Sequence, residues 1–185
     1  MMAVWTPGSY FVREYPRHLE RLRATSLAGE PLTMASTRKN RWQVNSAELP
    51  AVRLTYRVYG RQMSVRTNWI DTDFALLNGA ATFVTLADNA GRPHDVTIEL
   101  PPGWRQSASA LPAHPERGAE SYRAPDFDTF VDSPIVAGNP TIREFVVEGV
   151  LHALVNIGNV RDVGMWDATK AAADVERIVR QQQQF

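Results

Sequence analysis

The feature that most constrains the fold of this 185-residue sequence is a strict apolar–polar alternation from Val52 to Tyr59. Successive side chains of a β-strand point to opposite faces, so the alternate residues from Val52 to Val58 share one face, while Arg53 and Arg57 share the other. A shift of one residue would bury arginine, so the pattern fixes the register. The segment therefore predicts a strand with one covered face, and residues 63–67 resume the alternation.

Shorter segments rich in apolar and β-branched residues predict further strands between turn signals. These strands are expected at residues 19–25, 32–36, 41–44, 80–87, 96–100, 145–147 and 150–157. Asn78-Gly79 is most simply a hairpin turn before the apolar run. A surface loop is predicted near residues 106–118, and one helical turn near 126–131. The pattern as a whole predicts a mostly β, β-sandwich-like fold.

The C-terminal segment is typical of a helix. The Asp167 carboxylate is suited to accept the amide protons of a first helical turn. Glu176 precedes Arg180 by four residues, which is the favourable order for an ion pair along a helix. Apolar residues form one stripe at helical spacing, namely Ala168, Ala171, Ala172, Val175, Ile178 and Val179. One helix after many strands suggests a new unit, so we expect a β domain over residues 1–160 and a linker with another domain's first helix over 161–185.

Charge and cysteine content exclude several classes of function. Basic and acidic residues number 20 each, and the arginines are dispersed along the sequence, so no long-range field draws the chain to nucleic acid or an anionic membrane. Without cysteine there is no disulfide and no thiolate zinc site, although the compartment stays open between cytoplasm and periplasm. No signal peptide is recognisable. Lys39 and Lys170 are the only lysines, which indicates an arginine-rich bacterial protein.

No catalytic constellation is evident in the sequence. The four histidines, His18, His94, His114 and His152, are too far apart to form the H-E-x-x-H motif of a zinc peptidase. No G-x-S-x-G nucleophile elbow occurs either. The carboxylates Asp126, Asp128 and Asp132 leave open a small hydrolase, although helix capping and turn formation explain them more simply.

Seven short motifs in a fixed order resemble one known family. They are Trp5-Thr6-Pro7-Gly8-Ser9-Tyr10 with Arg13-Glu14, then Lys39-Asn40-Arg41-Trp42, Leu54-Thr55-Tyr56-Arg57-Val58-Tyr59, Ser64-Val65-Arg66-Thr67-Asn68, Leu77-Asn78-Gly79-Ala80, Pro101-Pro102-Gly103-Trp104 and Asp132-Ser133-Pro134. The chain resembles the N-terminal region of the glycyl aminopeptidases, metallopeptidase family sixty-one in the gluzincin group of zinc peptidases.

The resemblance implies an N-terminal β domain followed by a thermolysin-like catalytic domain. Zinc would belong to that parent enzyme, so we expect no catalytic residue, metal ligand or cofactor in this chain. Its partners would be its own catalytic domain and the parent's peptide substrate. The family also has strands before the first motif, and their absence would leave a sheet edge unpaired. We therefore expect an edge-to-edge dimer or the exchange of a segment between two chains.

The resemblance also nominates residues for the substrate cleft or the domain interface. They are Trp5, Pro7, Gly8, Ser9, Tyr10, Arg13, Asn78, Gly79, Asp132 and Ser133. A simpler interpretation makes Trp5 and Tyr10 core aromatics around a type II turn at Pro7-Gly8, and makes Asp132-Ser133 a loop whose aspartate bonds local amides. A stand-alone peptide- or carbohydrate-binding module stays open, and exposed tryptophans at Trp5, Trp69 or Trp104 on a concave face would favour it.

Overall fold

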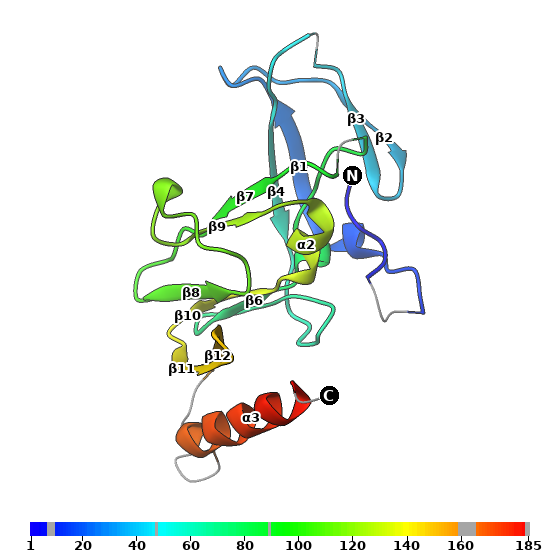
Figure 1. The fold of residues 1–185 in the computed structure, drawn as a ribbon. Coiled ribbons are helices and arrows are strands. Elements are labelled where there is room, and N and C mark those ends of the chain that lie inside the picture. Colours follow the sequence, from blue (N-terminus) through cyan, green and yellow to red (C-terminus); the bar gives the residue numbers. More distant parts are fainter. Residues whose placement is uncertain (7–9, 47, 89, 159–165, 184–185) are drawn as a thin grey trace.

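The computed structural model describes residues 1–6, 10–46, 48–88, 90–158 and 166–183. The chain is mostly β, with a sandwich-like arrangement of open sheets and one C-terminal helix (Figure 1). In chain order the elements are η1 (Tyr15–His18), β1 (Leu19–Thr25), β2 (Met34–Arg38), β3 (Arg41–Val44), β4 (Arg53–Val58), β5 (Trp69–Ile70), β6 (Ala75–Leu77), α1 (Gly79–Thr82), β7 (His94–Thr97), β8 (Gln106–Ser109), η2 (Pro115–Arg117), β9 (Ser121–Ala124), α2 (Phe127–Asp132), β10 (Ile135–Gly138), β11 (Thr141–Val147), β12 (Val150–Asn156) and α3 (Ala168–Gln182).

The largest sheet has the order β5-β6-β10-β8, and each neighbouring pair is antiparallel. Its central strand β10 places Val136 opposite Leu76 on one side and opposite Ala108 on the other. Ile135 and Ala137 of β10 are almost fully buried. The remaining strands form the antiparallel pairs β1–β4, β2–β3, β7–β9 and β11–β12.

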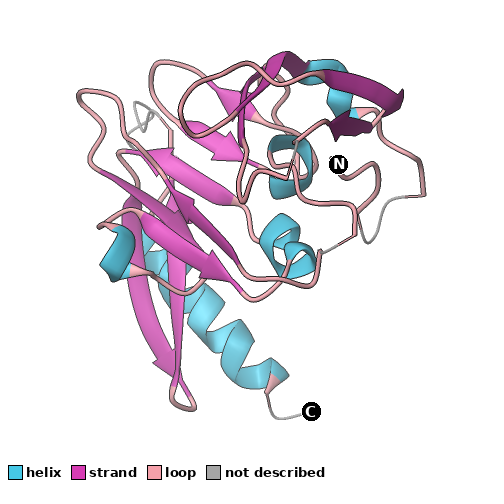
Figure 2. Ribbon diagram, turned by 90° about the horizontal axis from the view of Figure 1, so that it is seen from above, coloured by secondary structure: helices cyan, strands magenta, loops and turns pink. Residues whose placement is uncertain are grey.

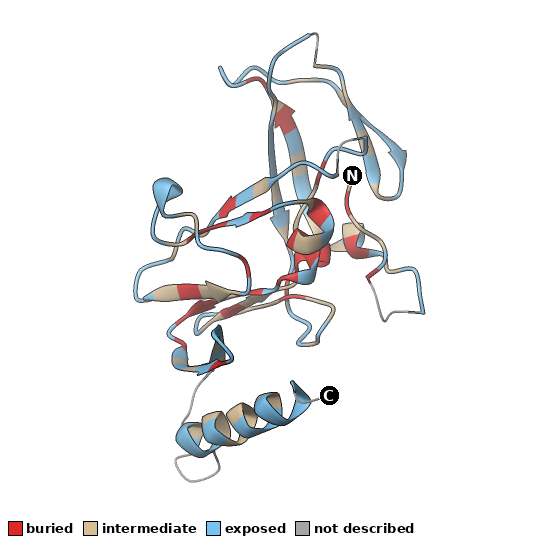
Figure 3. Ribbon diagram, in the orientation of Figure 1, coloured by how far each residue is buried: buried red, intermediate tan, exposed pale blue. Residues whose placement is uncertain are grey.

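The main core lies where α1 and α2 meet the ends of the strands, as the buried positions in Figure 3 show. Phe83 stacks on Phe130 with ring centroids 4.3 Å apart, and the ring of His94 packs against the same phenylalanine. Met2 is fully buried in this cluster and bridges to Val84. The N-terminal residues therefore contribute directly to the core.

Local patterns located several elements correctly. β1 and β3 occupy the predicted residues, and β4 falls inside the predicted alternation. The late hairpin β11–β12 turns at Glu148-Gly149, where both residues have positive φ, 50° and 80°. Two expectations nearby are wrong. Residues 64–67 form a turn instead of continuing a strand, and the predicted loop at 106–118 begins with β8.

The predicted hairpin turn at Asn78-Gly79 is wrong, and so is the strand predicted at residues 80–87. Asn78 stands at the N-cap position of the short helix α1, and Gly79 is its first residue. A Cβ on Gly79 would lie 2.6 Å from Cα of Val131 and 2.7 Å from the carbonyl oxygen of Phe130. This glycine thus serves the close approach of α1 to α2. The apolar residues 80–87 were interpreted as a strand because a buried helix and a buried strand have similar composition.

The C-terminal helix α3 confirms its predicted features. The Asp167 carboxylate accepts hydrogen bonds from the amides of Thr169 and Lys170, and Arg180 pairs with Glu176 at 2.6 Å. Arg180 also donates to the Val146 carbonyl at 3.1 Å, which ties α3 to β11. Figure 2 shows the helix beside the strands of this hairpin. Whether residues 161–185 belong to a separate domain stays a prediction.

Candidate functional site

The first motif contains exposed apolar residues. Tyr10, Phe11 and Val12 are 97%, 71% and 75% exposed, and Trp5 is 53% exposed. The interpretation of Trp5 and Tyr10 as core aromatics is therefore wrong. The buried aromatic of this segment is Tyr15, at 2% exposure, which anchors η1 in the core. Pro7, Gly8 and Ser9, with their predicted turn, lie outside the described residues. Clustered exposed apolar side chains are typical of interaction surfaces.

Two grooves adjoin this segment, and four residues line both of them, namely Val12, Arg13, Glu14 and Arg17. The first, of about 560 Å³, lies toward the turn at residues 62–67 and is named the motif groove. The second, of about 730 Å³, lies toward β2 and β3 and is named the hairpin groove. The motif groove is lined by Val12, Arg13, Glu14, Tyr15, Arg17, His18, Gln62, Ser64, Arg66 and Thr67.

Hydrogen bonds hold the turn that forms one wall of the motif groove. Thr67 donates its hydroxyl to the Gln62 carbonyl at 2.6 Å, and its Oγ1 lies 2.6 Å from the Ser64 hydroxyl. The Asn78 side chain donates to the Val65 carbonyl at 2.8 Å. Asn78 is therefore a positioning residue for this wall and does not line the groove itself.

The buried Asn68 connects this turn to α1. Its side-chain oxygen accepts from the Asn78 amide at 2.7 Å and from the Thr82 hydroxyl at 3.2 Å, and its nitrogen donates to the Ala81 carbonyl at 3.2 Å. Two motifs that are separate in the sequence thus meet at one buried amide. The motif residues at Asn68 and Asn78 are explained by this local architecture.

Arg13 and Glu14 lie at the boundary between the two grooves. The Arg13 guanidinium carbon is 5.8 Å from the ring centroid of Phe11. Glu14 forms an exposed ion pair with Lys39 at 2.5 Å, and this hydrogen bond lowers the pKa of the Glu14 carboxyl. Glu14 therefore stays ionised in neutral solution and links the N-terminal segment to the β2–β3 hairpin.

His18 has the properties of a neutral histidine. Its Nε2 accepts a hydrogen bond from Nε of Arg17 at 2.9 Å, and its ring stacks on Tyr59 with centroids 6.2 Å apart. Burial, and then the positive charge of Arg17, lower the pKa of His18. The motif groove thus presents a neutral imidazole beside arginines.

Asp132 and Ser133 lie apart from these grooves. Asp132 is the exposed last residue of α2 instead of a loop residue that bonds local amides, and Ser133 is buried with its hydroxyl donating to the Thr129 carbonyl at 2.8 Å. Gly79 belongs to the contact between α1 and α2, where it lies against Phe130 and Val131. Arg13 therefore lines both grooves, whereas Asp132 and Ser133 line neither of them.

Comparison with known proteins decides the family. The model of the peptidase M61 N-terminal domain matches residues 1–139. The chain belongs to this family. A solved aminopeptidase N family protein from Idiomarina loihiensis is similar, with 28% identity and a TM-score of 0.87. The alignment covers 98% of this chain but 30% of that protein, so this chain spans less than a third of that protein's length. No curated protein matches.

The described residues of this M61 domain do not fit a zinc site. No three histidine, aspartate or glutamate side chains among them lie close enough to hold a metal ion. The histidines have other contacts: His94 bonds the Thr85 hydroxyl at 2.9 Å, and the ring of His152 stacks on Phe145. The absence of zinc from this domain remains a prediction. No helix within the described ranges is long and apolar enough to cross a membrane.

The hydrolase interpretation gains no support from Asp126. Its carboxylate caps α2 by accepting from the Thr129 amide at 2.7 Å, and this bond is the main reason that its pKa is lowered. A carboxyl group with a lowered pKa is a poor general acid at neutral pH.

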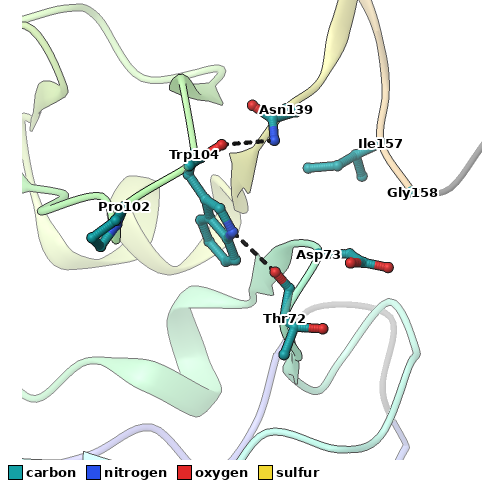
Figure 4. Close-up of a pocket in the computed structure, with 8 residues that line it drawn as sticks. Thr72, Asp73, Pro102, Trp104, Asn139, Ile157 and Gly158 are labelled. Atoms are coloured by element: carbon teal, nitrogen blue, oxygen red, sulfur yellow. Dashed lines mark hydrogen bonds between the residues drawn. The ribbon is translucent and has the colours of Figure 1, made fainter.

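A smaller cavity of about 280 Å³ lies beside Trp104 (Figure 4). The Trp104 indole donates to the Thr72 carbonyl at 3.2 Å, and the Asn139 side chain donates to the Gly103 carbonyl at 3.0 Å. Trp104 therefore forms a fixed wall of this cavity. The Trp69 indole does not share this role, since it donates a hydrogen bond to the Asp71 carboxylate.

Apart from Arg13, which its motif nominated, the sequence did not indicate the basic residues that gather at the two grooves. Arg13, Arg17, Arg38, Lys39 and Arg66 line them, although they are dispersed in the sequence. The two adjacent basic residues Arg38 and Lys39, between the strands predicted at residues 32–36 and 41–44, were the available signal. Folding brings these residues to the N-terminal segment, and the alternation of the strands carries no information on this contact.

Proposed function

We propose that this chain is the non-catalytic N-terminal domain of a zinc-dependent aminopeptidase and forms one wall of the substrate cleft of its catalytic domain. The observation that carries the proposal is the exposed segment Tyr10–Val12, whose Val12 lines both grooves, in a chain of the M61 N-terminal family. Exposed apolar residues of this kind favour burial against another domain. The described residues offer no zinc ligands, so the proposal assigns the metal to the catalytic domain.

A chimera tests the proposal. This chain would replace the matching segment of the Idiomarina loihiensis protein, once aminopeptidase activity of that protein has been measured. We expect the folded chimera to hydrolyse aminoacyl substrates within about tenfold of the parent's kcat/KM. Tyr10→Ser should lower this value by about tenfold, because an apolar contact between domains contributes roughly 1–2 kcal/mol.

Leu27→Ser is the matched control, since Leu27 is 61% exposed and lines neither groove. Equal effects of the two substitutions would refute the role of the exposed segment. Zinc-dependent hydrolysis by this chain alone would refute its non-catalytic role.

The alternative is a stand-alone binding module for peptides or carbohydrates, and the cavity at Trp104 favours it. Calorimetric titration with short oligosaccharides and peptides distinguishes the two. Binding that Trp104→Ala abolishes and Tyr10→Ser leaves unchanged would favour the module.

A further inference from the structure

The hairpin groove joins an apolar floor to a basic rim. Its volume of about 730 Å³ is within the range of ordinary ligand sites. Apolar side chains of three elements contribute to it: Val4 and Val12 from the N-terminal segment, Leu19 and Leu22 from β1, and Trp42 from β3. Leu19 and Trp42 also pack against the main core, so the floor is anchored.

The rim is strongly positive in a chain that is neutral overall. Arg13, Arg17, Arg38 and Lys39 line the groove together with a single carboxylate, that of Glu14. Lys39 pairs with this carboxylate but is itself 87% exposed at its side chain. Among the described residues, no carboxylate lies within ion-pair distance of the Arg38 guanidinium. Even without Arg13, three basic side chains line the groove against one carboxylate, so the groove has more positive charge than its own residues neutralise.

A β-bulge shapes the floor. The pairing of β1 with β4 shifts between Glu20 and Arg23, and Arg21 within this bulge has φ 54°. A left-handed conformation costs an arginine about 1–2 kcal/mol, and bulges are frequent next to functional sites because they redirect side chains. The residue that follows, Leu22, lines the groove. The residue that the bulge redirects therefore faces the groove and not the interior of the domain.

We propose that the hairpin groove binds an acidic peptide segment, in which an apolar side chain occupies the floor and flanking carboxylates pair with the basic rim. Charge complementarity supports this ligand class. A peptide fits better than a single fatty acid, because basic side chains from two separate segments, Arg17 on one and Arg38 and Lys39 on the other, line the groove and a single carboxylate cannot pair with both segments. This ligand class goes beyond the proposed cleft function, and binding is measured without a catalytic domain.

Fluorescence anisotropy with labelled octapeptides tests the proposal on the whole chain. One peptide combines glutamates with two central leucines, a second has glutamine for every glutamate, and a third has serine for both leucines. We expect a Kd of about 10–100 μM for the first at low salt, and weakening of about tenfold or more for each of the others. Equal affinity for the glutamate and glutamine peptides would overturn the proposal.

Charge variants locate the site. The double variant Arg38→Gln with Lys39→Gln should weaken binding by about threefold to thirtyfold, the range for two exposed ion pairs. The control pairs the chain's other lysine with an exposed arginine outside the grooves, as Arg53→Gln with Lys170→Gln, and should change affinity less than twofold. Circular dichroism confirms folding of both. Equal binding by the two double variants would overturn the proposal, and so would direct binding of decanoate to a chain that binds none of the peptides.

Discussion

Among single residues, Asn68 has the most consequential environment in the motif region. It is 3% exposed, and three hydrogen bonds of its amide hold α1 against the turn at residues 62–67. The Asn68 side chain is also closely packed against Gly60, since a Cβ atom added to Gly60 would lie 2.9 Å from Cβ of Asn68. Support for the groove wall thus depends on one buried side chain that never reaches the groove.

We predict that Asn68→Ala lowers the free energy of unfolding by about 2–4 kcal/mol, because it deprives buried donors and acceptors of their partner. Asn139→Ala is the control. Its exposed side chain also makes two hydrogen bonds, to Gly103 and Arg105, and water can replace them, so a loss below about 1 kcal/mol is expected. Urea titration measures both. A loss at Asn68 no larger than the control's would contradict the role of the network.

The sequence allowed part of the site to be predicted at this scale. Trp5, Tyr10 and Arg13 were nominated through their motif, and the structure places Arg13 in the lining of both grooves and leaves Trp5 and Tyr10 exposed. Arg38 and Arg66 were not nominated. Arg38 lines the hairpin groove and Arg66 the motif groove, each beside N-terminal residues that are distant in the sequence. Such long-range contacts leave no local periodicity.

Among the elements, α1 and α2 approach each other closely at Gly79. Gly79 packs against Val131 and Phe130, and this contact was misread as a turn signal. An Asn-Gly pair predicts a hairpin because glycine has great conformational freedom. In this structure, Gly79 is needed because its missing Cβ lets α1 pack closely against α2. β4 was predictable because its alternation is local. β10 was missed because it is short and its Ile135 and Ala137 are both covered by the fold.

We predict that Gly79→Ala lowers the free energy of unfolding by about 1–3 kcal/mol, because backbone atoms at 2.6 and 2.7 Å cannot yield as a side chain would. The corresponding fall in Tm is about 2–4 °C for each kcal/mol. Gly91→Ala is the matched control, since nothing lies within 4 Å of its added Cβ and its φ is not positive. Thermal unfolding that is the same for the two variants would show that α1 can move away from α2.

For the whole molecule, the open pairing of the sheets is the feature with consequences in solution. Within the described residues, β1–β4, β2–β3, β7–β9 and β11–β12 have two strands each. An edge strand offers unpaired N–H and C=O groups to another chain. The strand β12 has seven residues and exposed apolar side chains at Val150 and Leu151, so it supports the expected edge-to-edge dimer best.

We predict reversible dimerisation through β12, with a mass in light scattering that rises above 20.7 kDa as the concentration of the chain increases. Leu151→Lys should suppress it, because a lysine on a strand edge disfavours pairing with a second edge. Leu27→Lys is the control, since both leucines are 61% exposed and Leu27 lies in a turn. If the wild-type mass stays at one chain near 10 mg/mL, or if both variants dimerise alike, β12 does not pair between molecules, and its exposed residues are then available for another part of a longer protein.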